Sequence, residues 1–138
     1  MFRNVLVPVD LTDRHGPAVA IAGQLAGGGG AVTLLHVIEM IHGVGREDEP
    51  AFYDRLERHA RGHLDRLAAG LRGRAGSVTA DVVYGERGPA VVKYAAVHGA
   101  DLIVLTSHPV EFSDPGAGWN TLSYFIGIAA RCPVLLVK

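Results

Sequence analysis

The sequence contains a single cysteine and no long apolar run, and both absences limit what the protein can be. With Cys132 alone, the chain cannot form an internal disulfide. This cysteine lies in an apolar stretch, where we expect a small buried thiol and no catalytic role. No apolar run approaches the roughly 18 residues of a membrane-spanning helix, and residues 1–10 lack the features of a signal peptide. We therefore expect a cytoplasmic protein that does not bind membranes.

An excess of charge of one sign is also missing. The 138 residues include 13 basic and 14 acidic side chains, which gives a formal net charge of −1. A surface that binds nucleic acid needs a strong positive field, which this composition does not provide. The arginines between residues 55 and 72 are interleaved with acidic residues, which is typical of a solvated helix face. We expect no nucleic-acid partner.

The standard signatures of phosphate, metal and nucleophilic sites are absent as well. There is no G-x-x-x-x-G-K-[ST] loop, and the run 116–118 (Gly-Ala-Gly) is not completed by a third glycine. His59 and His63 are four residues apart, but no carboxylate ligand pattern surrounds them, so we expect two solvated side chains and no metal site. Ser107 and Ser113 have no identifiable orienting acid or oxyanion partner. These absences argue against an enzyme.

The sequence does contain a regular alternation of short apolar runs and helical patterns. The runs have the composition of buried strands. They span residues 5–9, 31–38, 77–84, 101–105 and 133–137. The alternation predicts an α/β fold, a parallel sheet with helices on both faces and right-handed crossovers. At this length we expect one domain that spans residues 1–138.

Local signals refine this order. Thr12 or Asp13 predicts the N-cap of the first helix. The run 27–30 of four glycines predicts its end; because it follows a helix and precedes a strand, it lies at the wrong end of the sheet for a phosphate loop. Apolar residues at every third or fourth position from 52 to 71 predict one long helix against the sheet. The polar and apolar alternation of residues 77–84 favours an edge strand.

Polar residues follow the first and fourth predicted strands. Asp10 ends the first strand, His108 lies in the long loop after the fourth, and Asn120 and Thr121 stand where the last helix begins. Ligands of parallel α/β sheets bind outside the carboxyl ends of the strands. A carboxylate at Asp10 suits a ribose hydroxyl, a neutral ring at His108 suits a base or sugar, and the first amides of the last helix suit an anion. The alternatives are a turn aspartate and a plain helix-start hydroxyl.

Four segments, in this order and spacing, resemble the universal stress proteins, the small UspA-type members of an adenine-nucleotide-binding α/β superfamily. The segments are Asn4–Asp10, Thr33–Val37, Gly99–His108 and Cys132–Val137. The resemblance covers essentially the whole chain. It implies a five-stranded parallel sheet in the order 3-2-1-4-5 and a homodimer that pairs the last strands. The residues of that strand are Val134, Leu135, Leu136 and Val137.

The resemblance also implies a set of nucleotide contacts at the strand ends and at the start of the last helix. The matching positions are Pro8, Val9, Asp10, Val37, Leu105, Thr106 and Thr121. Within this set, Asp10 corresponds to the ribose contact, Val37 to the backbone group that meets adenine, and Thr121 to the hydroxyl that holds phosphate.

This sequence departs from the family in the loop that holds phosphate. Pro109 stands where the family has a glycine, and Asn120 replaces the glycine before the phosphate-binding hydroxyl. Proline supplies no backbone amide, and glycine alone lets the backbone approach phosphate closely. Glu111 and Asp114 add negative charge beside the expected polyphosphate path, which opposes a highly charged anion. The sequence therefore argues against tight binding of ATP with Mg²⁺. It leaves open AMP, adenosine, weakly bound ATP, another small ligand or an empty pocket.

We interpret the chain as a homodimeric, nucleotide-binding stress-response or signalling module, and not as an efficient enzyme. Two alternatives stay open. One is a dimeric interaction protein of the same fold that binds no nucleotide, with Pro109, Phe112 and Trp119 filling the loop. The other is a weak ATPase, for which the sequence supplies no general base. The apolar last helix supports burial on two sides, which dimerisation or a neighbouring helix would provide.

Overall fold

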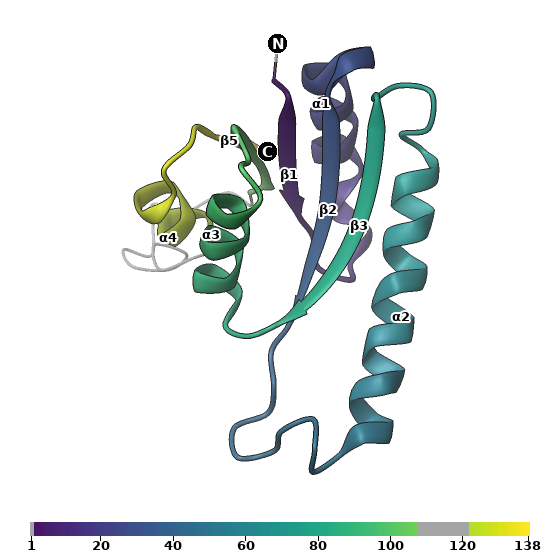
Figure 1. Cartoon of the computed structure of the whole chain (residues 1–138), viewed down its shortest axis with the longest axis vertical. Helices are drawn as coiled ribbons and strands as arrows, with labels where there is room; N and C mark the ends of the chain where they lie inside the picture. The colour runs from purple at the N-terminus through teal and green to yellow at the C-terminus, as the bar shows by residue number, and fades with distance from the viewer. Residues whose placement is uncertain (1, 108–121) are drawn as a thin grey trace, which may run out of the picture.

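The computed structural model describes residues 2–107 and 122–138, and over these residues strands and helices alternate as predicted (Figure 1). The strands are β1 (Asn4–Pro8), β2 (Ala31–Ile38), β3 (Ser77–Tyr84), β4 (Leu102–Thr106) and β5 (Val134–Val137). The helices are α1 (Gly16–Ala26), α2 (Pro50–Ala69), α3 (Arg87–Val97) and α4 (Leu122–Ala129). The sheet is entirely parallel in the order β3-β2-β1-β4-β5, which confirms the expected fold class and strand order.

The sheet is covered on both faces, with α1 and α2 on one side and α3 and α4 on the other (Figure 1). Successive side chains of a strand point to opposite faces. In β1, Val5 and Val7 therefore belong to the core under α1 and α2, whereas Leu6 packs under α3 and α4. None of the three is more than 2% exposed. Burial on both faces explains why the central strands are apolar without alternation.

The long helix α2 buries the predicted apolar stripe and two further side chains. Tyr53 is 1% exposed, and its hydroxyl accepts the amide of Ile41 (3.0 Å) and donates to the carbonyl of Val44 (2.6 Å). His63 is also buried, so the expectation of a solvated pair with His59 is wrong for this residue. It follows Ala60 by three positions and therefore shares the inner face of the helix. Its Nε2 has no hydrogen-bond partner among the described residues.

The amino end of the sheet is closed by backbone contacts. The glycine run ends α1, as predicted, with Gly27 in the left-handed region at φ 63°. A Cβ on Gly30 would lie 2.6 Å from the carbonyl oxygen of Phe2 and would also collide with that of Ala26, so only glycine fits there. This run lies away from the carboxyl ends of the strands, as expected for a helix stop.

The two edges of the sheet differ. Among the described strands, β3 pairs with β2 alone, which confirms the predicted edge strand, and it exposes the hydroxyl residues Ser77 and Thr79. At the other edge of the described sheet, β5 pairs with β4, and its Leu135 and Leu136 are 37% and 42% exposed. One edge is therefore polar and the other apolar.

Two local predictions are wrong, one about the start of α1 and one about the burial of the cysteine. Neither Thr12 nor Asp13 caps α1 with its side chain, because a short 3-10 turn, Asp13–His15, comes first and α1 begins at Gly16. Cys132 is only half-buried, since it lies in the turn between α4 and β5 and not in a packed strand. Partial burial still raises the pKa of its thiol, which disfavours the reactive thiolate.

Candidate functional site

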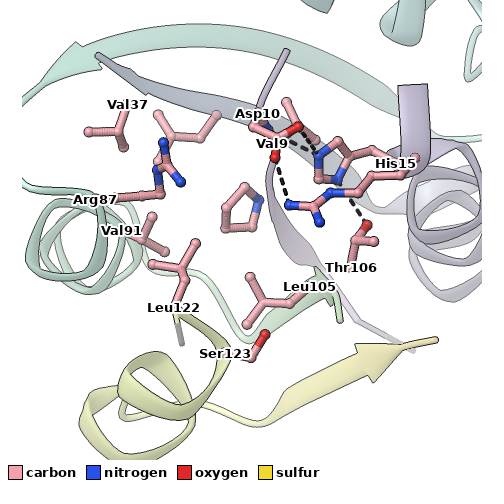
Figure 2. Close-up of a pocket in the computed structure, with 13 residues that line it drawn as sticks. Val9, Asp10, His15, Val37, Arg87, Val91, Leu105, Thr106, Leu122 and Ser123 are labelled. Atoms are coloured by element: carbon pink, nitrogen blue, oxygen red, sulfur yellow. Dashed lines mark hydrogen bonds and ion pairs between the residues drawn. The ribbon is translucent and has the colours of Figure 1, made fainter. Parts of the chain in front are cut away.

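The carboxyl ends of β1, β2 and β4 surround a cavity of about 200 Å³ (Figure 2). The 3-10 turn after β1 and the first turns of α3 and α4 complete its wall. Six residues that the sequence proposed for the site line this cavity: Pro8, Val9, Asp10, Val37, Leu105 and Thr106. The other three, His108, Asn120 and Thr121, lie outside the described residues. Parallel strands thus bring together side chains that are almost a hundred positions apart in the sequence.

Asp10 is the centre of the polar end of the cavity. Its Oδ1 accepts hydrogen bonds from the amide of Thr12 (2.9 Å), from the Thr12 hydroxyl and from Nε2 of His15 (2.7 Å). Its Oδ2 accepts one from Arg14 (2.7 Å). Burial alone would raise the pKa of Asp10, but the bonds from Thr12 and His15 outweigh it and hold the pKa well below its usual range. The carboxylate is therefore ionised at neutral pH and already engaged by groups of its own turn.

His15 is the site residue that the sequence analysis missed. It ends the 3-10 turn, is 4% exposed, and lies between Asp10 and the end of β4 (Figure 2). Its Nδ1 lies 2.9 Å from Oγ1 of Thr106, while its Nε2 faces the Asp10 carboxylate. One signal was available: Pro17 favours the first turn of a helix, which moves the helix start to Gly16 and leaves His15 in the preceding turn.

The contact between His15 and Asp10 determines where the imidazole proton lies. Two acceptors would repel each other at 2.7 Å, so Nε2 carries a proton and donates it to Oδ1. The backbone amide of Asp10 is also 3.1 Å from Nε2, but it cannot donate to a protonated nitrogen. The shorter, charge-assisted bond to the carboxylate is the stronger of the two. A hydroxyl, an imidazole and a carboxylate thus form a continuous chain from Thr106 to Asp10.

The rest of the cavity wall is mainly apolar. Val37, Val91 and Leu105 line it from β2, α3 and β4, and Leu122 lines it from the first turn of α4 (Figure 2). An apolar wall with a polar end is the usual composition of a site for a small organic ligand. The arrangement suits a flat apolar ring against the wall and hydroxyl groups at the polar end.

Two arginines give the cavity positive charge. Arg14, from the 3-10 turn, pairs with Asp10 and keeps its side chain 49% exposed. Arg87, from the first turn of α3, extends toward Val37 and the end of β2 (Figure 2). No ion pair of Arg87 occurs within the described residues. With one carboxylate and two guanidinium groups, the described lining favours an anionic ligand.

His36 on β2 stabilises the backbone of Val9, which lines the cavity. Its Nδ1 donates to the carbonyl of Val9 (2.9 Å), which fixes the backbone at the end of β1. Burial lowers the pKa of His36, and the nearby charge of Arg87 acts in the same direction. The ring is therefore neutral at pH 7 and serves as a structural donor.

The described residues contain no group of three histidine, cysteine or acidic side chains that could hold a metal ion. Over the same part of the chain, no helix has the length and apolar character needed to cross a membrane.

The comparisons with known proteins agree with this architecture. UspA from Lactobacillus plantarum superposes with a TM-score of 0.80 at 22% identity, over 99% of this chain and 97% of that chain. A universal stress protein from Archaeoglobus fulgidus in complex with dAMP gives 0.72 at 18%, over 99% and 98%. A family protein from Arabidopsis thaliana with AMP bound gives 0.69 at 17%, over 99% and 91%.

These structural likenesses are all below 25% identity and show the shared fold. No curated protein matches the sequence. The model of the universal stress protein family, in contrast, matches residues 1–138. The chain belongs to the universal stress protein family.

Proposed function

We propose that residues 1–138 act as one universal stress protein domain that binds AMP or adenosine in the cavity and serves as a stress-response or signalling module. The observation that carries this proposal is the cavity itself, since three strand ends bring the six proposed contacts around one space with an apolar wall and a polar end. Family members have been solved with AMP, dAMP or cAMP, which supports an adenine nucleotide as the ligand class.

The lining suggests how such a ligand would lie. The base would pack against the apolar wall and meet the backbone at Val37. The ribose would lie at the polar end. There, among the described residues, Oδ2 of Asp10 accepts a bond from Arg14 alone and keeps a lone pair for a sugar hydroxyl. Only one carboxylate oxygen of Asp10 would thus contact the ribose, because Oδ1 already accepts bonds from Thr12 and His15.

A ligand with one phosphate group fits the positive charge of the cavity better than a ligand without phosphate. Arg14 and Arg87 supply two positive charges, and Ser123 in the first turn of α4 adds a hydroxyl donor. The first amides of a helix also favour an anion. The acidic residues Glu111 and Asp114, which lie between β4 and α4 in the sequence, add negative charge that opposes a longer phosphate chain. We therefore expect AMP to bind more tightly than adenosine, and both more tightly than ATP with Mg²⁺.

Thermal unfolding with AMP, adenosine, ATP or no ligand, each at the same Mg²⁺ concentration, tests this order. A ligand at about 100 times its dissociation constant stabilises the fold by about 2.7 kcal/mol, which is a shift of several degrees for a chain of this size. A larger shift with ATP than with AMP would contradict the order. No shift with any of the three would favour the interaction protein that binds no nucleotide.

We also propose that the protein is a homodimer that pairs the free edge of β5. The supporting observation is a group of exposed apolar side chains on β5 and α4. They are Leu135, Leu136, Tyr124, Phe125 and Ile128, with 37–68% of each exposed. Exposed apolar surface that adjoins an unpaired strand edge is typical of a protein interface.

Sedimentation of a Leu136→Lys variant tests this interface. The charge would lie at the centre of the apolar edge, so we expect the dimer to dissociate at micromolar concentration. Val97→Lys is the matched control, because Val97 is 69% exposed on α3 and lies outside the proposed interface. A wild-type protein that sediments as a monomer, or equal dissociation of both variants, would contradict the proposed edge.

A further inference from the structure

A series of hydrogen bonds connects Thr106 through His15 to Asp10. It begins at the neutral Thr106 hydroxyl and ends at the charged Asp10 carboxylate. Thr106 lines the cavity at the end of β4 (Figure 2). We infer that Thr106 determines sugar specificity: its hydroxyl acts as a hydrogen-bond acceptor for a ribose hydroxyl of the ligand, and His15 and Asp10 hold it in that role. This inference rests on the proposed nucleotide site.

The first step is the state of His15. The ionised Asp10 carboxylate holds the proton of the imidazole on Nε2, at 2.7 Å from Oδ1. In the neutral form the imidazole carries a proton on one nitrogen only, and with that proton on Nε2, Nδ1 is an acceptor. The ring is 4% exposed, and each of its nitrogens already faces a partner, Oδ1 of Asp10 or Oγ1 of Thr106.

The second step is the direction of the bond to Thr106. Since Nδ1 is the acceptor, the Thr106 hydroxyl donates its single proton across the 2.9 Å contact. A hydroxyl has one proton and two lone pairs, so the oxygen can then only accept from anything else. No other hydrogen bond of this oxygen occurs among the described residues, and its lone pairs are available to the cavity.

The third step is the chemistry of the ligand. Two acceptors stand at the polar end of the cavity, Oγ1 of Thr106 and Oδ2 of Asp10. A phosphate or carbonyl oxygen would oppose them lone pair to lone pair. The two hydroxyls of ribose, each a donor, satisfy both. We therefore expect this protein to prefer a ribonucleotide over its deoxy counterpart, although a family member from Archaeoglobus fulgidus has been solved with dAMP.

His15 is a positioning residue in this scheme and does not touch the ligand. Without its Nδ1 acceptor, the Thr106 hydroxyl would rotate and offer its proton to the cavity as well. The sugar preference should therefore weaken even though Thr106 is intact. A purely structural role of His15 would lower the affinity for all ligands equally and leave the preference unchanged.

The test is calorimetric titration of AMP, 2′-deoxy-AMP and 3′-deoxy-AMP at pH 8, where histidine is normally neutral. Wild type should bind AMP roughly 5- to 20-fold more tightly than at least one deoxy analogue, the loss expected for one hydrogen bond. Thr106→Val removes the hydroxyl and should abolish the preference over the deoxy analogue that lacks the ribose hydroxyl facing Thr106, while Thr106→Ser should retain it. The preference over the other analogue, which depends on Asp10, should remain in both variants. His15→Phe, which keeps a ring but no nitrogen, should reduce the preference that depends on Thr106.

A ratio of affinities is a sharp measure because loss of folding would weaken all three ligands together. Thr79→Val is the matched control, since it removes a threonine hydroxyl from the exposed edge strand β3 and should leave the ratio unchanged. Equal binding of the three nucleotides by wild type, or two unchanged ratios in Thr106→Val, overturns the sugar assignment while nucleotide binding stands. No binding of any of them overturns the proposed function itself. Should Thr106→Val fail to fold, the Thr106→Ser and His15→Phe variants still decide the question.

Discussion

Two aspartates stand at opposite ends of the sheet and have similar surroundings at first sight. Asp10 follows β1 at the carboxyl end, and Asp101 precedes β4 at the amino end. Asp10 accepts the amide of Thr12, and Asp101 accepts those of Arg3 (2.9 Å) and Asn4 (3.0 Å). For both carboxyls, burial would raise the pKa, and the hydrogen bonds they accept outweigh it and lower the pKa.

The partners of the two carboxylates differ in kind. Asp101 binds backbone amides and ties the start of β1 to the start of β4. Asp10 also binds the side chains of His15 and Arg14, and through His15 it reaches Thr106 on the wall of the cavity. A low carboxyl pKa therefore does not mark a ligand site by itself. The side-chain connection to a cavity is what distinguishes the carboxyl end of this sheet from its amino end.

The largest loss of stability should come from a substitution that disturbs the backbone contacts at the amino end of the sheet. Gly30→Ala places a Cβ against the carbonyl oxygens of Phe2 and Ala26, and we expect it to lower the free energy of unfolding by roughly 3 kcal/mol. Gly29→Ala is the control, because its Cβ meets no atom within 4 Å. Urea unfolding measures both. If the amino end is only structural, folded Gly30→Ala protein keeps the wild-type affinity for AMP.

Asp10→Asn should have the next largest effect, and it should change two properties at once. The variant loses charge-assisted hydrogen bonds to His15 and Arg14, so we expect about 2 kcal/mol less stability in urea. It also loses the group that holds the His15 proton, so AMP affinity measured by calorimetry should fall at least tenfold. If Asp10→Asn is destabilised but binds AMP with unchanged affinity, Asp10 has only a structural role, as we expect for Asp101.

Asp101→Asn is the reciprocal change. The amide oxygen of asparagine can still accept one of the two backbone amides, so we expect a loss of about 1 kcal/mol in urea unfolding. AMP affinity should stay at the wild-type value. A change in affinity would show that the two ends of the sheet are coupled, which the separation of their hydrogen bonds argues against.

The smallest effect we expect is on how the free energy of unfolding changes with pH under acidic conditions. Each carboxyl has a lower pKa in the folded than in the unfolded state, where it is about 4. The unfolded state therefore binds more protons below that value, and stability is lost as the pH falls from about 4 toward the folded pKa. Between pH 6 and 8 the two carboxyls should give no pH dependence.

The acid loss of stability should shrink more in Asp10→Asn than in Asp101→Asn, because Asp10 accepts more hydrogen bonds. Denaturant unfolding from pH 2.5 to 7 measures this. An equal reduction in both variants would mean that the side-chain partners of Asp10 contribute little to its pKa.

The fold was largely predictable from local patterns, and the strand order was not. Buried strands such as residues 31–38 and the long amphipathic helix 50–69 have periodicities that depend on nearby residues only. Alternation of such elements predicts a parallel sheet but leaves the order of its strands open, so the order came from the resemblance to a family.

The candidate site was predictable where it depends on strand ends. Asp10 and Thr106 each follow an apolar run, and the rule for parallel sheets places them at one edge. His15 was missed as a site residue because its burial depends on contacts made across the fold and not on its neighbours in sequence. A histidine in a turn has no periodicity to reveal it.

The unequal edges of the sheet limit how copies of this chain can assemble. β3 offers an outer edge with exposed Ser77 and Thr79, whereas β5 offers Leu135 and Leu136. If two apolar edges were present, each copy could recruit another at both ends, and a continuous sheet would grow into a fibre. With one apolar edge, a β5-to-β5 contact uses the same surface on both copies and leaves only polar edges outside. If the proposed β5-to-β5 contact forms, the assembly is complete at two subunits and has no apolar edge left to extend it.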